Sequence, residues 1–166
     1  SGEVHGTETD STILTRLNNW YSNNLASHAD DIDMNSGFCN DRQPSTSESS
    51  SNGLGGTNGT TTYYGAYIRL YTNKVPSLRC SNNSDLFTVS NSNKGNKALQ
   101  YPIGLITADE ATYAGSVFAT SYTANSYYLK TGQDYWTMSP NTFAYGNEGS
   151  AYVIVVGSDG YFDIRG

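Results

Sequence analysis

This chain is poorly supplied with general bases, because it contains only two histidines, His5 and His28. Activation of a serine or cysteine nucleophile requires an adjacent base. His5 lies close to the first residue, and His28 lies in a polar segment where a solvated histidine is the simpler interpretation. The nucleophile elbow Gly-x-Ser-x-Gly does not occur in the sequence. We therefore expect no catalytic residues and no enzyme.

Neighbouring carboxylates are the remaining candidates for acid–base catalysis of the glycosidase type, and they occur as Asp30 with Asp31 and as Asp109 with Glu110. Side chains that are adjacent in sequence diverge on a helix. Thr107 and Glu110 have the spacing of a capping box, and Asp109 falls in the first helical turn, where a negative charge is favoured. These patterns predict structural roles for the carboxylates.

A calcium site is the more serious alternative, because Asp31, Asp33 and Asn35 alternate as in an EF-hand loop. The match then fails, since Ser36 stands where that loop needs glycine and Arg42 stands where it needs glutamate. The acidic segment therefore allows either an irregular metal site at Asp31, Asp33 and Asn35 or a solvated acidic turn. Calcium is the only cofactor that these residues suggest.

The two cysteines, Cys39 and Cys80, lie too far apart in sequence for a redox Cys-x-x-Cys motif or for one arm of a zinc site. A structural disulfide is the preferred interpretation, and two buried thiols in a cytosolic protein are the alternative. In the chain-entropy model, a bond that closes so long a loop stabilises a fold by about 4 kcal/mol.

Length and composition limit the number of domains and the classes of partner. A chain of 166 residues has the usual size of one domain, so we expect a single domain over 1–166. The net charge of -6 gives no footprint for nucleic acid, and no apolar run is long enough to cross a membrane. Because the chain opens at Ser1, we expect that an N-terminal anchor or leading helix precedes it.

Apolar periodicity predicts a small set of elements. A helix should begin at Asp10 or Ser11, where good N-cap residues precede apolar side chains at intervals of three and four, and it should end within 23–27. A second, short helix should follow the capping box and end at Gly115. Residues 43–62 are almost devoid of apolar side chains and should form a flexible loop. The expected hairpins pair 127–129 with 135–138, and 151–156 with 161–164, and the run 153–156 should be a central strand.

Tyrosine is abundant, with 14 residues in the chain, and a tyrosine ring can be buried while its hydroxyl stays solvated. Tyr122, Tyr127, Tyr128 and Tyr145, together with the polar loop 116–126, could form an aromatic face that binds glycans or proteins. The alternative is that these tyrosines belong to the core and to cross-strand pairs. We expect Trp136 in the core.

The order of these elements resembles the C-type lectin-like fold, in the version shared with formylglycine-generating enzymes. More closely, four motifs resemble a domain of uncharacterised function in surface and prepilin-like proteins of Gram-positive gut bacteria. The motifs are Phe-Cys-Asn-Asp-Arg at 38–42, Tyr-Pro-Ile-Gly-Leu-Ile-Thr-Ala-Asp-Glu at 101–110, Tyr-Trp-Thr-Met-Ser-Pro at 135–140 and Gly-Ser-Asp-Gly at 157–160. In that family the chain usually continues into a closing strand, and its absence here would leave a sheet edge open to pairing with another chain.

The resemblance implies an α+β fold, with two helices packed on short antiparallel sheets and with long loops. It implies a non-catalytic extracellular head of a bacterial surface or pilin-like protein, engaged in adhesion or filament assembly. Its partners would be a host or bacterial surface glycan or protein, or copies of itself. One alternative is an enzyme related to formylglycine-generating proteins, although this chain lacks the late cysteine pair that holds copper in that family. The other alternative is a purely structural self-assembling subunit.

Overall fold

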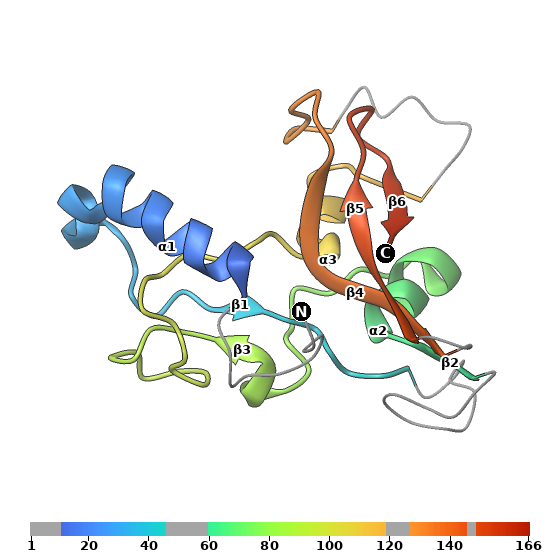
Figure 1. Ribbon diagram of the computed structural model, residues 1–166, viewed down its shortest axis with the longest axis horizontal. Coiled ribbons are helices and arrows are strands. Elements are labelled where there is room, and N and C mark those ends of the chain that lie inside the picture. The colour runs from blue at the N-terminus through green and yellow to red at the C-terminus, as the bar shows by residue number, and fades with distance from the viewer. Residues whose placement is uncertain (1–10, 46–59, 119–126, 146–148) are drawn as a thin grey trace. The chain divides into compact units, whose positions relative to one another are not determined.

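A computed structural model of the chain describes residues 11–45, 60–118, 127–145 and 149–166 (Figure 1). It combines helices with two sheets, which confirms the α+β class. The described residues cluster into two compact units. One unit comprises 11–38 and 83–104, and the other comprises 39–45, 60–82 and the described residues from 105 onward. The single domain over 1–166 stays a prediction.

The first unit begins with α1 (Thr12–Asn24), which confirms the predicted helix and its end. The amide of Leu14 donates to the hydroxyl of Ser11 at 3.1 Å, so Ser11 is the N-cap. Tyr21 is the buried residue of this helix, and its ring stacks on Tyr101 with ring centroids 4.7 Å apart. A 3-10 helix, η1 (Ala26–Asp31), follows.

The rest of the first unit is built from short pieces, the 3-10 turn η3 (Asn83–Asp85) and β3 (Leu86–Phe87). The strand β1 (Phe38–Cys39), whose second residue already belongs to the other unit, forms a two-stranded sheet with β3. Gly95 has a φ of +59°, and a Cβ atom there would lie 2.4 Å from the carbonyl oxygen of Leu86. Glycine is therefore the residue that this turn can accept.

The second unit contains a four-stranded antiparallel sheet in the order β2-β4-β5-β6. Its strands are β2 (Thr60–Tyr63), β4 (Tyr135–Tyr145), β5 (Gly149–Val156) and β6 (Phe162–Arg165). Ile154, Val155 and Val156 are buried in β5, which lies between two other strands. The predicted central strand and its hairpin to β6 are thereby confirmed.

Three helical segments pack against this sheet: α2 (Gly65–Tyr67), the π-helical turn η2 (Ile68–Asn73) and α3 (Ala108–Tyr113) (Figure 1). The capping box is confirmed, because the amide of Glu110 donates to the Thr107 hydroxyl at 3.1 Å while the Thr107 amide donates to Glu110 Oε2 at 2.8 Å. The buried core cluster draws on all of these elements and consists of Ala66, Leu70, Ala108, Ala111, Tyr127, Ile154, Val156 and Phe162.

Three predictions about this unit are wrong. Residues 127–129 do not form a hairpin with 135–138. They form a turn in which the Tyr128 amide donates to the carbonyl of Ala114, and the strand β4 that contains 135–138 pairs with β5 and β2 instead. Residues 60–62 are part of β2 and not of a loop, since a run of β-branched threonines suits a strand; residues 46–59 of that predicted loop lie outside the described residues. Trp136, which pairs with Val155, is 51% exposed and does not lie in the core.

The edge strand β6 is less open than the sequence suggests. The Gly157 amide donates to the backbone carbonyl of Tyr161. Because inward and outward backbone groups alternate along an antiparallel strand, the amides and carbonyls of Phe162 and Ile164 point away from β5. The amide of Phe162 donates to the carbonyl of Val117 at 3.1 Å, and the amide of Ile164 donates to the carboxylate of Asp163 at 2.8 Å. These bonds occupy both outward donors, which is a common way of protecting a sheet edge.

Candidate ligand-binding face

Three tyrosine rings form a stack on the second unit. Tyr63 ends β2, Tyr67 ends α2 and Tyr71 lies in η2, and we call these residues the tyrosine ladder. The centroids of the Tyr63 and Tyr67 rings are 5.1 Å apart, and those of Tyr67 and Tyr71 are 5.0 Å apart with an interplanar angle of 13°. A spacing of four residues brings side chains onto the same side of a helix, which explains the contact of Tyr67 with Tyr71; Tyr63 joins them from the end of β2.

Phe118 supports the ladder from the side. Its ring meets Tyr71 edge-on, with centroids 5.7 Å apart and an angle of 87°, and it also packs on Phe162 of the core at 5.0 Å. Aromatic pairs in stacked and edge-on arrangements are worth about 0.5–1.5 kcal/mol each beyond the burial of their area. The ladder is therefore anchored to the core at one side and exposed at its end, where Tyr71 is 53% exposed.

On the same helical segment, Arg69 is held by two carboxylates. Its Nε donates to Asp109 Oδ1 at 2.9 Å and its Nη2 donates to Asp109 Oδ2 at 2.6 Å, which is a bidentate pair. The same Nη2 also donates to Asp41 Oδ2. We call Asp41, Arg69 and Asp109 the ion triad. The amide of Ser77 adds a bond to Asp109 Oδ1 at 2.7 Å.

The ion triad is largely withdrawn from water, with both carboxylate side chains buried and that of Arg69 25% exposed. Burial lowers the pKa of Arg69, but the hydrogen bonds to Asp109 and Asp41 and the charges of both carboxylates outweigh burial, so the pKa lies above its ordinary value. The two buried carboxylates need the guanidinium to stay charged in the folded protein, because a buried charge without a counter-charge lowers the free energy of unfolding.

The ion triad fixes a segment that could not hold its shape alone. Helices as short as α2 and η2 are not stable without tertiary contacts, and η2 ends at Lys74 in the left-handed conformation. Gly65 allows the approach of the arginine, because a Cβ atom there would lie 2.9 Å from Arg69 Nη1. The clamp on Arg69 therefore also positions Tyr67 and Tyr71.

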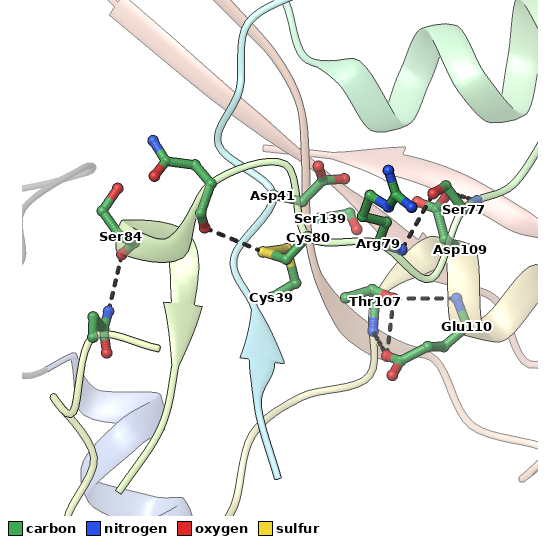
Figure 2. The surroundings of a disulfide bond; sticks show 12 residues. Cys39, Asp41, Ser77, Arg79, Cys80, Ser84, Thr107, Asp109, Glu110 and Ser139 are labelled. Atoms are coloured by element: carbon green, nitrogen blue, oxygen red, sulfur yellow. Dashed lines mark hydrogen bonds between the residues drawn. A yellow bond between two sulfur atoms is a disulfide. The ribbon is translucent and has the colours of Figure 1, made fainter. Parts of the chain in front are cut away.

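A disulfide joins the segment that carries Asp41 to the segment that carries Ser77, whose amide donates to Asp109. Cys39 and Cys80 are bonded, with their Cα atoms 5.5 Å apart, which confirms the predicted disulfide. Figure 2 shows the bond with Asp41 on one of the joined segments and Ser77 on the other. Both cysteines of the chain are consumed in it, so no thiol pair remains to hold a metal.

Of the four tyrosines that the sequence singles out, the two whose side chains the structure describes differ in exposure. Tyr127 is buried in the core cluster, and its hydroxyl bonds to that of Tyr135; burial raises the pKa of Tyr127. Tyr127 thus has the core position that the sequence left open as the alternative, and ligand binding by these four tyrosines stays a prediction. Tyr128 is 87% exposed, whereas Tyr122 and the side chain of Tyr145 lie outside the described residues.

The predicted calcium ligands lie in the first unit, where Asn35 hydrogen-bonds to Asp33 and to residues 92 and 93. Its amide donates to Asp33 Oδ1 at 2.8 Å, while its side-chain oxygen accepts from the Ser92 hydroxyl at 3.2 Å and from the Asn93 amide at 3.1 Å. Asp31 is exposed. In the described part of the chain, no three His, Cys, Asp or Glu residues are grouped as metal ligands, and calcium at Asp31, Asp33 and Asn35 stays a prediction.

The remaining catalytic candidates have structural or solvated positions. Glu110 is engaged in the capping box and Asp109 in the ion triad. His28 and Asp30 are exposed in η1, and His5 lies outside the described residues.

Sequence reasoning missed the tyrosine ladder, although tyrosines at positions 63, 67 and 71 have the spacing that could have revealed it. The ion triad had no local signal, because Asp41 and Asp109 lie 28 and 40 residues from Arg69.

No protein family, no functionally described protein and no solved structure matches this chain. The C-type lectin-like fold therefore stays a prediction beyond the α+β class. Within the described residues, none of the helices has the length and apolar character needed to span a membrane.

Proposed function

We propose that this chain is a non-catalytic, extracellular binding module, the globular head of a bacterial surface or pilin-like protein. Its ligand-contact surface is the tyrosine ladder. The observation that carries the proposal is a stack of three tyrosine rings, exposed at Tyr71, on a segment that a buried ion triad and a nearby disulfide hold in place. Rings that are fixed before binding lose little conformational entropy when a ligand arrives.

The chemistry of the ladder favours a surface glycan or a protein as the ligand. A tyrosine offers an apolar ring for stacking and a hydroxyl that both donates and accepts hydrogen bonds. Tyr71 presents both at the exposed end of the row, followed by the exposed polar residues Thr72 and Asn73. Such a surface suits adhesion to another cell or to a matrix.

Two features support the extracellular and non-catalytic parts of the proposal. A structural disulfide is typical of proteins that fold outside the reducing cytosol. An oxygen-activating enzyme related to formylglycine-generating proteins would need a reactive cysteine pair, whereas Cys39 and Cys80 are bonded to each other. The carboxylates with the deepest burial, Asp41 and Asp109, are occupied by Arg69.

Binding to a broad array of glycans and host-matrix proteins, measured with calcium and again with EDTA, tests this function. We expect saturable binding by the monomer that is retained in EDTA, because the ladder contains no metal ligands. Binding lost in EDTA would move the site to the acidic segment at Asp31, Asp33 and Asn35. An absence of binding in both conditions would overturn the proposal.

A further inference from the structure

Within the tyrosine ladder, Tyr71 is the ring that a ligand can reach most easily. Tyr67 stacks on both Tyr63 and Tyr71, with ring centroids 5.1 Å and 5.0 Å away. Rings at these distances are in contact, so no third group can enter between them. Tyr63 and Tyr67 are partly buried, whereas Tyr71 is 53% exposed. A ligand therefore meets the ladder at its Tyr71 end.

The positions of the neighbouring rings show which side of Tyr71 is open. One face of Tyr71 lies against Tyr67, with an interplanar angle of 13°. Phe118 is 5.7 Å from Tyr71 and 6.5 Å from Tyr67, and it is nearly perpendicular to both rings. So close an approach to Tyr67 places Phe118 beside the stacked pair and not on the far face of Tyr71. The exposed part of Tyr71 therefore comes from its far face and its free edge, and the far face can stack on one flat group.

The residues that adjoin Tyr71 in the chain are neutral and form hydrogen bonds. Thr72 and Asn73 follow it directly and are exposed. A hydroxyl and an amide side chain can each donate and accept. Between 60 and 73 the only charged residue is Arg69, and its guanidinium is bound to the two carboxylates of the ion triad. The open ring is thus followed by uncharged donors and acceptors.

One open ring face matches a sugar better than a protein in size. A specific protein interface covers about 800 Å² on each partner and involves many residues. A hexopyranose is about as large as a tyrosine ring, and it carries C–H groups on its flat face and hydroxyls around its edge. It can therefore stack on an aromatic ring and form hydrogen bonds with neutral side chains at the same time.

We infer that the tyrosine ladder binds one neutral hexopyranose unit of a surface glycan. The C–H face of the sugar stacks on the far face of Tyr71, and its hydroxyls form hydrogen bonds with Thr72 and Asn73. This inference rests on the proposed function, because it names the ligand class of the same surface. A ring of about a dozen non-hydrogen atoms, bound with ordinary ligand efficiency, gives a dissociation constant on the order of 1 mM. Several copies on one cell surface would raise the overall affinity.

Saturation-transfer NMR with neutral methyl hexopyranosides tests this contact. The probes are the methyl glycosides of glucose, galactose and N-acetylglucosamine at millimolar concentration. We expect saturation of the protein's aromatic protons to reach the C–H protons of at least one sugar. Tyr71→Ala should weaken its binding about tenfold or more, and Tyr71→Phe should weaken it much less because the ring is retained. Tyr128→Ala is the matched control, since it removes a tyrosine that is 87% exposed outside the ladder.

Two further variants separate a neutral sugar from other ligands. Lys74 is the first exposed charge after the ladder segment, and Lys74→Ala should leave the binding unchanged. Binding should also be the same in about 0.01 M and about 1 M salt, although the Debye length falls from about 30 Å to about 3 Å. Val75 and Leu78 are exposed apolar residues of the same unit, at 64% and 67%, and their joint replacement by serine should not affect the sugar.

The possible results are distinguishable from a failure of the proposed function. A protein that binds on the ligand array, with no response from any hexopyranoside, would overturn the sugar and leave the binding module standing. Sugar binding that is undiminished in Tyr71→Ala would place the sugar elsewhere and overturn the inference. Binding that is lost in high salt, or in the Val75→Ser and Leu78→Ser variant, would also overturn it, because the ligand would then need charge or a wider apolar contact. All of these positions are exposed, so the urea midpoints should stay close to that of the parent chain.

Discussion

Removal of the Arg69 guanidinium should strongly destabilise the second unit. Arg69→Met keeps much of the side-chain volume but removes the Arg69 cation from Asp41 and Asp109, whose side-chain exposures are only 5% and 2%. Breaking a buried ion pair from one side costs about 3–5 kcal/mol. Because a quarter of the Arg69 side chain is exposed, we expect a loss at the lower end, about 3 kcal/mol, in equilibrium urea unfolding.

The same reasoning predicts a rescue. Adding Asp41→Asn and Asp109→Asn to Arg69→Met removes the two carboxylate charges that Arg69 balances, and it should recover most of the lost stability, since neutral replacement of a whole buried ion group is often tolerated. Asparagine suits both sites. It accepts the left-handed conformation of Asp41, whose φ is 51°, and at position 109 it retains an oxygen for the Ser77 amide.

Arg165→Met is the matched control, because Arg165 also bridges two carboxylates, those of Asp134 and Asp163, but on the exposed surface. Exposed ion pairs contribute little to stability, so the urea midpoint should barely move. The reasoning would be refuted by an Arg69→Met variant as stable as the Arg165→Met control, or by a triple variant no more stable than Arg69→Met alone.

Three further results are expected. Without reductant, alkylation should label neither Cys39 nor Cys80, and the intact mass should rise by two protons on reduction; two labelled thiols would contradict the disulfide. Thr107→Ala should lower the free energy of unfolding by about 1 kcal/mol, because the N-cap of α3 is lost, and an unchanged value would show that the cap is dispensable. Burial raises the pKa of Tyr64 and of Tyr127, so stability should be full below pH of about 10 and fall as pH rises through the raised pKa values. Tyr127→Phe should reduce that alkaline loss, and an equal loss would contradict the assignment.

Local signals account for the parts of the fold that the sequence predicts correctly. The helix α1, the capping box of α3 and the buried strand β5 each depend on residues within a few positions of one another. Apolar periodicity and capping residues therefore suffice to identify them. The disulfide followed from there being only two cysteines.

The errors concern pairing partners, which depend on contacts between distant segments. An aromatic run such as 127–129 looks extended, but the deciding interaction is the burial of the Tyr127 ring in the core. The tyrosine ladder was missed for the same reason, since the sequence does not tell which tyrosines share a surface. Arg69 meets two carboxylates from remote segments, and nothing near Arg69 in the sequence indicates this.

The most direct test of the central claim compares two tyrosines on the ligand array. Tyr71→Ala removes the exposed end of the tyrosine ladder, and Tyr128→Ala removes a still more exposed tyrosine outside it; unchanged circular dichroism would establish that both variants are folded. We expect binding to be lost in Tyr71→Ala and retained in Tyr128→Ala. Loss of binding in Tyr128→Ala with full binding in Tyr71→Ala would contradict the assignment of the ladder as the ligand-contact surface.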